Sequence, residues 1–200
     1  MKGIPFGYKN SWIIFKSTET KSIIESLKEF LEFQGEITWE QGLNKAYLGS
    51  FFLTLPIQGW TFLISSRCSE IKSRLLIKSK LFNEIHYYST HRSSDFLEWE
   101  KYYEGKLIRA FSISDGEIIK DEGEVSDVEI QIAQKELNTT LENWTDDQEM
   151  IDYIRSKNIL ANLGDEDNIM ELAGNWSINP LQMNTIDIDD TGYLFEANKM

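Results

Sequence analysis

Two tight turns within one long strand-forming stretch restrict the folds open to this chain. Between Glu84 and Lys120, aromatic and branched residues alternate with polar ones as they do in half-buried strands, and turn signals stand at Glu104-Gly105 and Asp115-Gly116. Turns this short join antiparallel neighbours, whereas parallel strands need a long crossover connection. The stretch therefore predicts an antiparallel meander, and a parallel doubly wound sheet is the rival architecture.

Helices and further strands are expected on both sides of this meander. Helical spacing of apolar residues predicts helices over 18–33, 69–81 and 126–137, with shorter ones over 38–47, 145–155 and 165–173. Thr38 with Gln41, and Ser126 with Glu129, have the spacing of capping boxes. Strands are expected over 11–16, 51–55 and 60–65, and the segment from Thr185 is an edge strand or a frayed end.

Together these elements predict one α+β domain over residues 1–200. Its sheet is twisted and mainly antiparallel, with a central meander and flanking helices. An acidic helical half, about residues 124–180, is expected to pack on the sheet.

Charge is distributed unevenly along the chain. Residues 1–110 carry 15 Lys and Arg against 12 Asp and Glu, whereas residues 111–200 carry 5 against 21. Such an acidic half repels nucleic acids and anionic membranes and favours a basic partner. The alternative interpretation is a solvated acidic surface that keeps the protein in solution.

Cysteine content and hydropathy limit the compartment. Cys68 is the single cysteine, so an intramolecular disulfide and a thiolate zinc site are excluded. The apolar run from Phe51 to Ser66 is interrupted by Pro56, Gln58 and Gly59, and the N-terminus has no sustained apolar region typical of a signal peptide. We expect a bacterial-type cytosolic protein.

The chain offers few residues for catalysis or metal binding. His86 and His91 have Asp95 and Glu98 nearby, but side chains five apart in a strand point to opposite faces, so a metal site would need a bulge between them. Cys68 beside Arg67 could be a nucleophile, and Glu98 with Glu100 could act as acid and base. The common mechanistic motifs do not occur, and we expect no enzyme activity and no cofactor.

One loop in the middle of the sheet carries a concentrated polar sequence. His91, Arg92 and Asp95 interrupt an aromatic strand, and an arginine there can make a two-pronged contact to a carboxylate. We predict a local polar network of these three residues, with a solvated loop as the alternative.

Several islands of the chain resemble a family of uncharacterised bacterial cytosolic proteins. They are ITWEQGLNKAY, LPIQGWTFLIS, YYSTHRSSDFLEWEKYYEGKLIRAFSISDGE and DEDNIMELAGNWSINP, at residues 37–47, 55–65, 87–117 and 165–180. This chain departs from the family in having Ser65-Ser66 where a glycine is more usual. Members occur near polymorphic or contact-dependent toxin systems, so the resemblance implies an immunity-like binding protein and transfers no catalytic residues.

Charge and resemblance together predict a cytosolic immunity or antitoxin-like protein that neutralises a basic toxin domain stoichiometrically. The acidic clusters would steer the encounter and two tryptophans would anchor it. The expected partner-binding residues are Asp121, Glu122, Glu124, Asp146, Asp147, Glu149, Asp165, Glu166 and Asp167, with Trp144 and Trp176. The alternatives are a regulatory or scaffold module with another basic partner, and a small hydrolase that uses His91, Arg92 and Glu98.

Overall fold

The backbone forms one antiparallel sheet of nine strands. The structure is a computed structural model that describes residues 1–77, 81–137 and 147–198. The strand order is β2-β9-β3-β4-β1-β5-β6-β7-β8, and every neighbouring pair is antiparallel. The strands are β1 (Ser11–Phe15), β2 (Leu31–Thr38), β3 (Phe51–Thr54), β4 (Thr61–Ser65), β5 (Glu84–His91), β6 (Phe96–Tyr103), β7 (Lys106–Ser114), β8 (Glu117–Gly123) and β9 (Thr191–Ala197).

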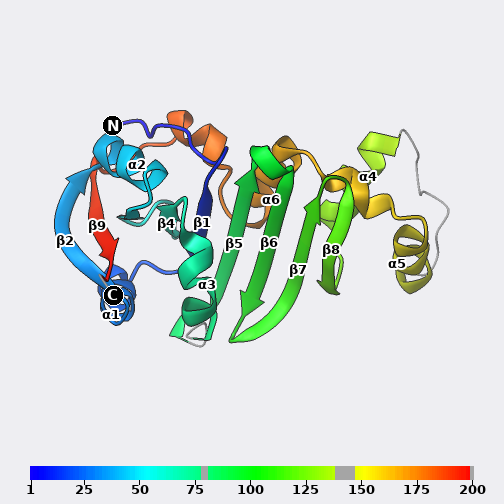
Figure 1. The fold of residues 1–200 in the computed structure, drawn as a ribbon, viewed down its shortest axis with the longest axis horizontal. Coiled ribbons are helices and arrows are strands. Elements are labelled where there is room, and N and C mark those ends of the chain that lie inside the picture. The colour runs from blue at the N-terminus through cyan, green and yellow to red at the C-terminus, as the bar shows by residue number, and fades with distance from the viewer. Residues whose placement is uncertain (78–80, 138–146, 199–200) are drawn as a thin grey trace.

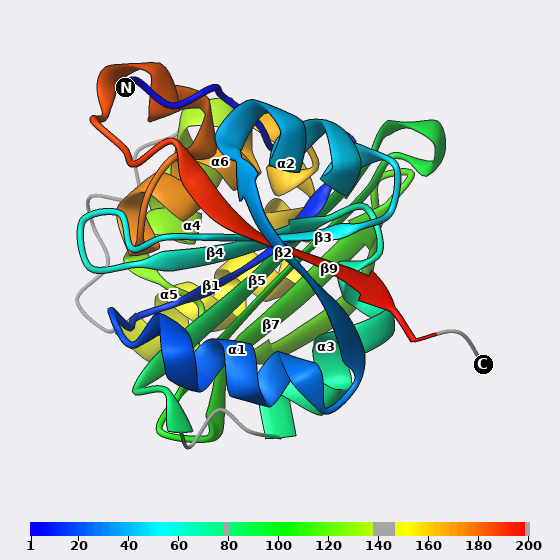
Figure 2. The ribbon, with the colours of Figure 1, turned by 90° about the vertical axis from the view of Figure 1, so that its left-hand side faces the viewer.

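Helices cover both faces of the sheet, which twists strongly from the β2 edge to the β8 edge (Figures 1 and 2). The helices are α1 (Thr20–Lys28), α2 (Trp39–Tyr47), α3 (Cys68–Ile77), α4 (Asp127–Leu137), α5 (Asp147–Ser156) and α6 (Glu166–Trp176), and short 3-10 turns are η2 (Arg92–Ser94), η3 (Ile159–Leu163) and η4 (Pro180–Thr185). The α+β class and the antiparallel meander from β5 to β8 are thus as the sequence predicts, and the parallel alternative is wrong.

Alternation along the strands divides the core into two layers. In β1, Trp12 and Ile14 pack with residues of α2, α4, α6 and η3, whereas Ile13 and Phe15 pack with α1 and α3. All four side chains are completely buried. Because successive strand residues point to opposite faces, the sheet needs a helical layer on each side of its centre.

The predicted helix over 18–33 is wrong in its second half. Helix α1 ends at Lys28, and Leu31 begins β2, which pairs with β9 around a bulge between Phe33 and Gly35. Phe30 and Leu31 continue the helical spacing and are buried in the same layer as Leu27, yet they lie beyond the helix end. The spacing of these apolar residues shows only that they are buried in one core layer. A short helix followed by a strand can bury them there as well as one long helix can.

The C-terminal segment also differs from expectation. Strand β9 lies between β2 and β3, so it is an interior strand rather than an edge strand or a frayed end. We expected this helix to end at Ala173, with Gly174 and Asn175 as its stop. Helix α6 instead continues through both residues and ends at Trp176. Packing of α6 against β5 and β6 outweighs the low helix propensity of these residues.

One of the two expected capping boxes forms. The Glu129 carboxylate accepts hydrogen bonds from the Ser126 amide (2.8 Å) and hydroxyl (2.8 Å), and the Glu129 amide donates to Ser126 Oγ at 3.4 Å. Thr38 is the N-cap of α2 but makes no side-chain cap hydrogen bond.

Within the described residues, no helix combines the length and apolar character needed to cross a membrane.

Candidate functional site

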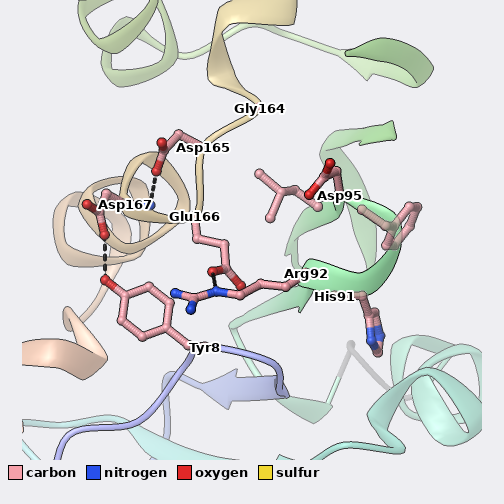
Figure 3. A pocket seen from close by; sticks show the side chains of 10 residues that line it. Tyr8, His91, Arg92, Asp95, Gly164, Asp165, Glu166 and Asp167 are labelled. Carbon is pink, nitrogen blue, oxygen red and sulfur yellow. Dashed lines mark hydrogen bonds and ion pairs between the residues drawn. The ribbon is translucent and has the colours of Figure 1, made fainter. Parts of the chain in front are cut away.

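A groove opens where the chain reverses between β5 and β6, beside the N-terminus of α6 (Figure 3). Its volume is about 580 Å³, and its walls come from three separate segments of the chain. The lining residues are Tyr8, His91, Arg92, Asp95, Phe96, Leu97, Gly164, Asp165, Glu166 and Asp167.

Local backbone geometry creates the two acidic walls. Strand β5 ends at His91, η2 follows, and Asp95 takes a left-handed conformation (φ 38°) that turns the chain into β6. Aspartate tolerates this conformation better than most residues because its short side chain can bond locally. On the other wall, Asp165 is the N-cap of α6 and accepts from the Asp167 amide at 2.7 Å.

Arg92 crosses the groove to meet α6. Its Nε donates to Glu166 Oε2, and its guanidinium lies 4.7 Å from the centre of the Tyr8 ring (Figure 3). The Tyr8 hydroxyl donates to Asp167 Oδ1 at 2.5 Å, and this bond to an anion raises the pKa of Tyr8 to about 12. The three contacts join the N-terminal segment, the β5–β6 turn and α6.

The groove carries an excess of negative charge. Four of its lining residues are carboxylates, Asp95, Asp165, Glu166 and Asp167, and one is an arginine, Arg92. Glu166 Oε1 is buried and has no hydrogen-bond partner among the described residues. Carboxylates beside the aromatic rings of Tyr8 and Phe96 suit an ammonium or guanidinium group, which gains from both charge and ring contact.

A smaller hollow of opposite character adjoins the groove. It measures about 400 Å³ and is lined by Lys9, His91, Arg92 and Ser93. The hollow therefore adjoins the groove along His91 and Arg92, and Lys9 adds a positive charge beside it.

The structure brings together two groups of residues that the sequence treats separately. His91, Arg92 and Asp95 line the same groove as Asp165, Glu166 and Asp167. Arg92 makes its carboxylate contact with Glu166 of α6 rather than with Asp95, and the His91 side chain points away from this ion pair (Figure 3). The polar residues of this loop therefore connect to a distant helix instead of forming a purely local network.

The cluster of Asp121, Glu122 and Glu124 is not one surface. Asp121 turns inward and bonds Arg109 Nη1 (2.5 Å) and Arg155 Nε (2.9 Å), while Glu122 and Glu124 are exposed. Burial alone would raise the pKa of Asp121, but these arginines hold it below its ordinary value. Asp121 thus has a structural role.

The remaining predicted contact residues are only partly described. Asp146 and Trp144 lie outside the described residues, as does the side chain of Asp147, and Glu149 is exposed on α5. Trp176 is half-buried, with its ring 5.6 Å from the His86 ring and 5.2 Å from Lys101 Nζ. Its indole belongs to the contact between α6 and the sheet and is not a free anchor.

The residues considered for metal binding or catalysis are dispersed. His86 is completely buried, and His91 lies at the groove. Glu98 and Glu100 lie on the face of β6 opposite to Leu97 and Trp99. There Nζ of Lys72 in α3 lies 2.8 Å from Glu98 Oε1 and 3.1 Å from Glu100 Oε1. In the described part of the chain, no three His, Cys, Asp or Glu residues lie close enough together to hold a metal ion.

Tyr8 is a groove residue that sequence reasoning missed. It stands in an N-terminal segment without helical or strand periodicity, and nothing local marks it as a partner of residues near position 167. Its neighbours Gly7 (φ 125°) and Lys9 (φ 55°) adopt left-handed backbone conformations that direct it towards α6.

Comparison with protein-family models, curated proteins and solved structures finds no match for this chain. The structure itself shows an α+β domain with a carboxylate-rich groove at the turn between β5 and β6.

Proposed function

We propose that the protein is an immunity or antitoxin-like protein of the cytosol that binds one basic protein partner stoichiometrically and blocks it. The supporting observation is the groove, whose lining includes four carboxylates, those of Asp95, Asp165, Glu166 and Asp167, and one guanidinium, that of Arg92. A lysine or arginine of a cationic partner surface would pair with these carboxylates and lie beside the Phe96 ring, because the Arg92 guanidinium already lies over the Tyr8 ring.

Charge of this kind acts mainly on the rate of encounter. The net charge of −13 attracts a basic partner over about a Debye length, ~8 Å at physiological salt. Rim charges change the association rate and its salt dependence, whereas desolvated contacts control dissociation. A toxin that acts on nucleic acid carries a cationic substrate site, which an acidic groove would complement and cover.

The hydrolase alternative loses support from the fold. His91 and Arg92 lie at the groove, whereas Glu98 binds Lys72 on the other face of β6. Acid–base catalysis needs its groups within hydrogen-bond reach of one reacting atom. A regulatory module with another basic partner would use the same groove, so only the identity of the partner separates it from the immunity function.

The test is co-expression with each candidate toxin whose gene is found to neighbour the gene of this protein, followed by pull-down and growth rescue. A groove variant carries Asp95→Asn, Glu166→Gln and Asp167→Asn; asparagine at position 95 tolerates the left-handed backbone. The matched control carries Glu32→Gln, Glu36→Gln and Glu40→Gln, which remove the same charge at the β2 end of the sheet. All three control residues are exposed.

We expect the groove variant to bind at least tenfold more weakly, to associate more slowly and to lose rescue. The control should keep most of the affinity because it preserves the local field of the groove. Equal affinity of both variants would remove the groove from the mechanism, and absence of binding to every neighbouring toxin would contradict the immunity function itself.

A further inference from the structure

The side chain of His86 lies at the centre of a buried cluster between the sheet and the end of α6. The residue is completely buried, and its ring lies 5.1 Å from the Trp60 ring and 5.6 Å from the Trp176 ring. Trp60 precedes β4, and Trp176 is the last residue of α6. The imidazole therefore lies beside two indoles, one from the segment before β4 and one from the end of α6, on the same face of the sheet.

Both ring nitrogens of His86 have partners on the same strand. Nε2 lies 2.8 Å from Glu84 Oε1, and Nδ1 lies 3.3 Å from the Tyr88 hydroxyl. Because a carboxylate can only accept, Nε2 carries the proton of the neutral ring, and Nδ1 accepts from Tyr88. Both ring nitrogens are therefore hydrogen-bonded when the imidazole is neutral and carries its proton on Nε2.

Glu84 favours a second proton on His86, whereas two nearby lysines disfavour it. Glu84 is already bound by Lys101 (3.0 Å) from β6 and by Lys16 (3.2 Å) from the end of β1. The same lysines lie over the two indoles, Lys16 over Trp60 and Lys101 over Trp176. An imidazolium here would place three cations around one carboxylate.

Protonation would also reverse a hydrogen bond. A proton on Nδ1 would turn that nitrogen from an acceptor into a donor facing the Tyr88 hydroxyl. The hydroxyl would have to turn towards Ser177, which already interacts with Tyr88 and is the C-cap of α6. The change would therefore reach the helix end through both Trp176 and Ser177.

We propose that His86 is an acid-sensitive latch, and that its protonation releases Trp176 and the last turn of α6 from the sheet. Burial is the main cause that lowers the pKa of His86, the two lysines lower it further, and Glu84 opposes them. A histidine that is neutral when packed contributes stability above its ordinary pKa of 6.5, and that contribution is lost as the pH falls below 6.5.

The test uses the full chain without any partner. Tryptophan emission is followed from pH 7.5 to 4.5 together with far-ultraviolet circular dichroism and hydrogen exchange of residues 174–178, corrected with an unstructured peptide for the intrinsic effect of pH. We expect a red shift of emission and at least a tenfold loss of protection below pH 6.5, while the far-ultraviolet signal stays native.

Two variants test whether the pH transition comes from His86. His86→Gln keeps a donor towards Glu84 and cannot gain a proton, so it should lack the transition, whereas His91→Gln changes the second histidine of the chain and should retain it. Emission that stays unchanged until the whole protein unfolds, or a transition that persists in His86→Gln, would overturn the latch.

A further variant keeps the inference testable if His86→Gln fails to fold. Trp176→Phe retains His86 and weakens the packing that protonation must disrupt, so the imidazole should take up its proton at higher pH in histidine NMR spectra. An unchanged His86 titration in Trp176→Phe would show that protonation and release are not coupled.

Discussion

Arg92 and Glu166 form an ion pair across 74 residues of sequence and thereby fix the N-terminus of α6 to the β5–β6 turn. The pair is more than half exposed on the arginine side, where the side chain retains 53% of its accessible surface. Exposed pairs contribute little to global stability, so the pair acts mainly on local geometry.

Arg92→Lys should therefore loosen α6 locally without unfolding the protein. Lysine keeps the charge but loses the planar group that lies over Tyr8. We expect a several-fold faster hydrogen exchange at residues 166–169 and a melting temperature close to that of the native chain. Protection equal to the native chain would show that Tyr8 and Asp167 hold the helix by themselves.

The buried pair of Arg109 and Glu129, in contrast, should contribute strongly to the global stability of the protein. Arg109 Nε binds Glu129 Oε1 at 2.8 Å, both side chains are nearly inaccessible, and Glu129 also accepts from the Trp99 indole at 3.0 Å. Removing one partner leaves a buried charge, so Arg109→Met should cost about 3–5 kcal/mol in urea unfolding. The double variant Arg109→Met/Glu129→Leu should recover part of the loss. If its loss of unfolding free energy equals the sum of the losses in the two single variants, the prediction is wrong.

Phe52 lies between two glycines that leave room for its ring. A Cβ at Gly42 would lie 2.3 Å from Phe52 Cδ2, and one at Gly192 would lie 2.4 Å from Phe52 Cε2. Gly42→Ala should therefore destabilise the protein by about 1–3 kcal/mol through overpacking. In a double-mutant cycle with Phe52→Leu, measured by urea unfolding, the two changes should cost less together than the sum of their separate effects.

Acid should weaken the protein in a second pH range, below that of His86. Burial would raise the pKa of Glu84, but hydrogen bonds from His86 and Lys101 outweigh it and lower this pKa from 4.5 to about 2. A carboxylate with a lowered folded pKa gives its full stability above pH 4.5 and loses it as the pH falls towards 2.

Glu84→Gln should consequently be less stable than the native chain at pH 7, and its stability should fall less between pH 4.5 and 2.5. Urea unfolding at each pH measures both effects, with Glu36→Gln on β2 as an exposed control. A variant whose stability declines as steeply as that of the native chain would exclude Glu84 as the source of the acid sensitivity.

Cys68 should be inert in the folded protein. Its thiol is completely buried, its Sγ lies 3.5 Å from the Ser11 carbonyl oxygen, and burial raises its pKa. Because the thiolate is the reactive form, a thiol reagent should modify Cys68 at the rate of unfolding. Rapid labelling under native conditions, with no effect of added denaturant, would contradict this placement.

The amino-acid sequence determined the features that depend on neighbouring residues. The turns at Glu104-Gly105 and Asp115-Gly116 fix the meander, since both pairs adopt the left-handed backbone that tight hairpins require. The Ser126 and Glu129 capping box also forms within one helical turn. Such interactions are encoded locally, so their pattern is legible without knowledge of the fold.

Tertiary structure decided where distant segments meet. The insertion of β9 between β2 and β3, the inward turn of Asp121 and the joining of Tyr8, Arg92 and Glu166 in one groove are absent from any local pattern. Each depends on the free energy of packing and pairing between residues far apart in the chain, which outweighs local preference. An acidic residue therefore became either a buried ion-pair partner or a groove carboxylate according to the contacts of the folded chain, although its sequence neighbourhood is similar in both cases.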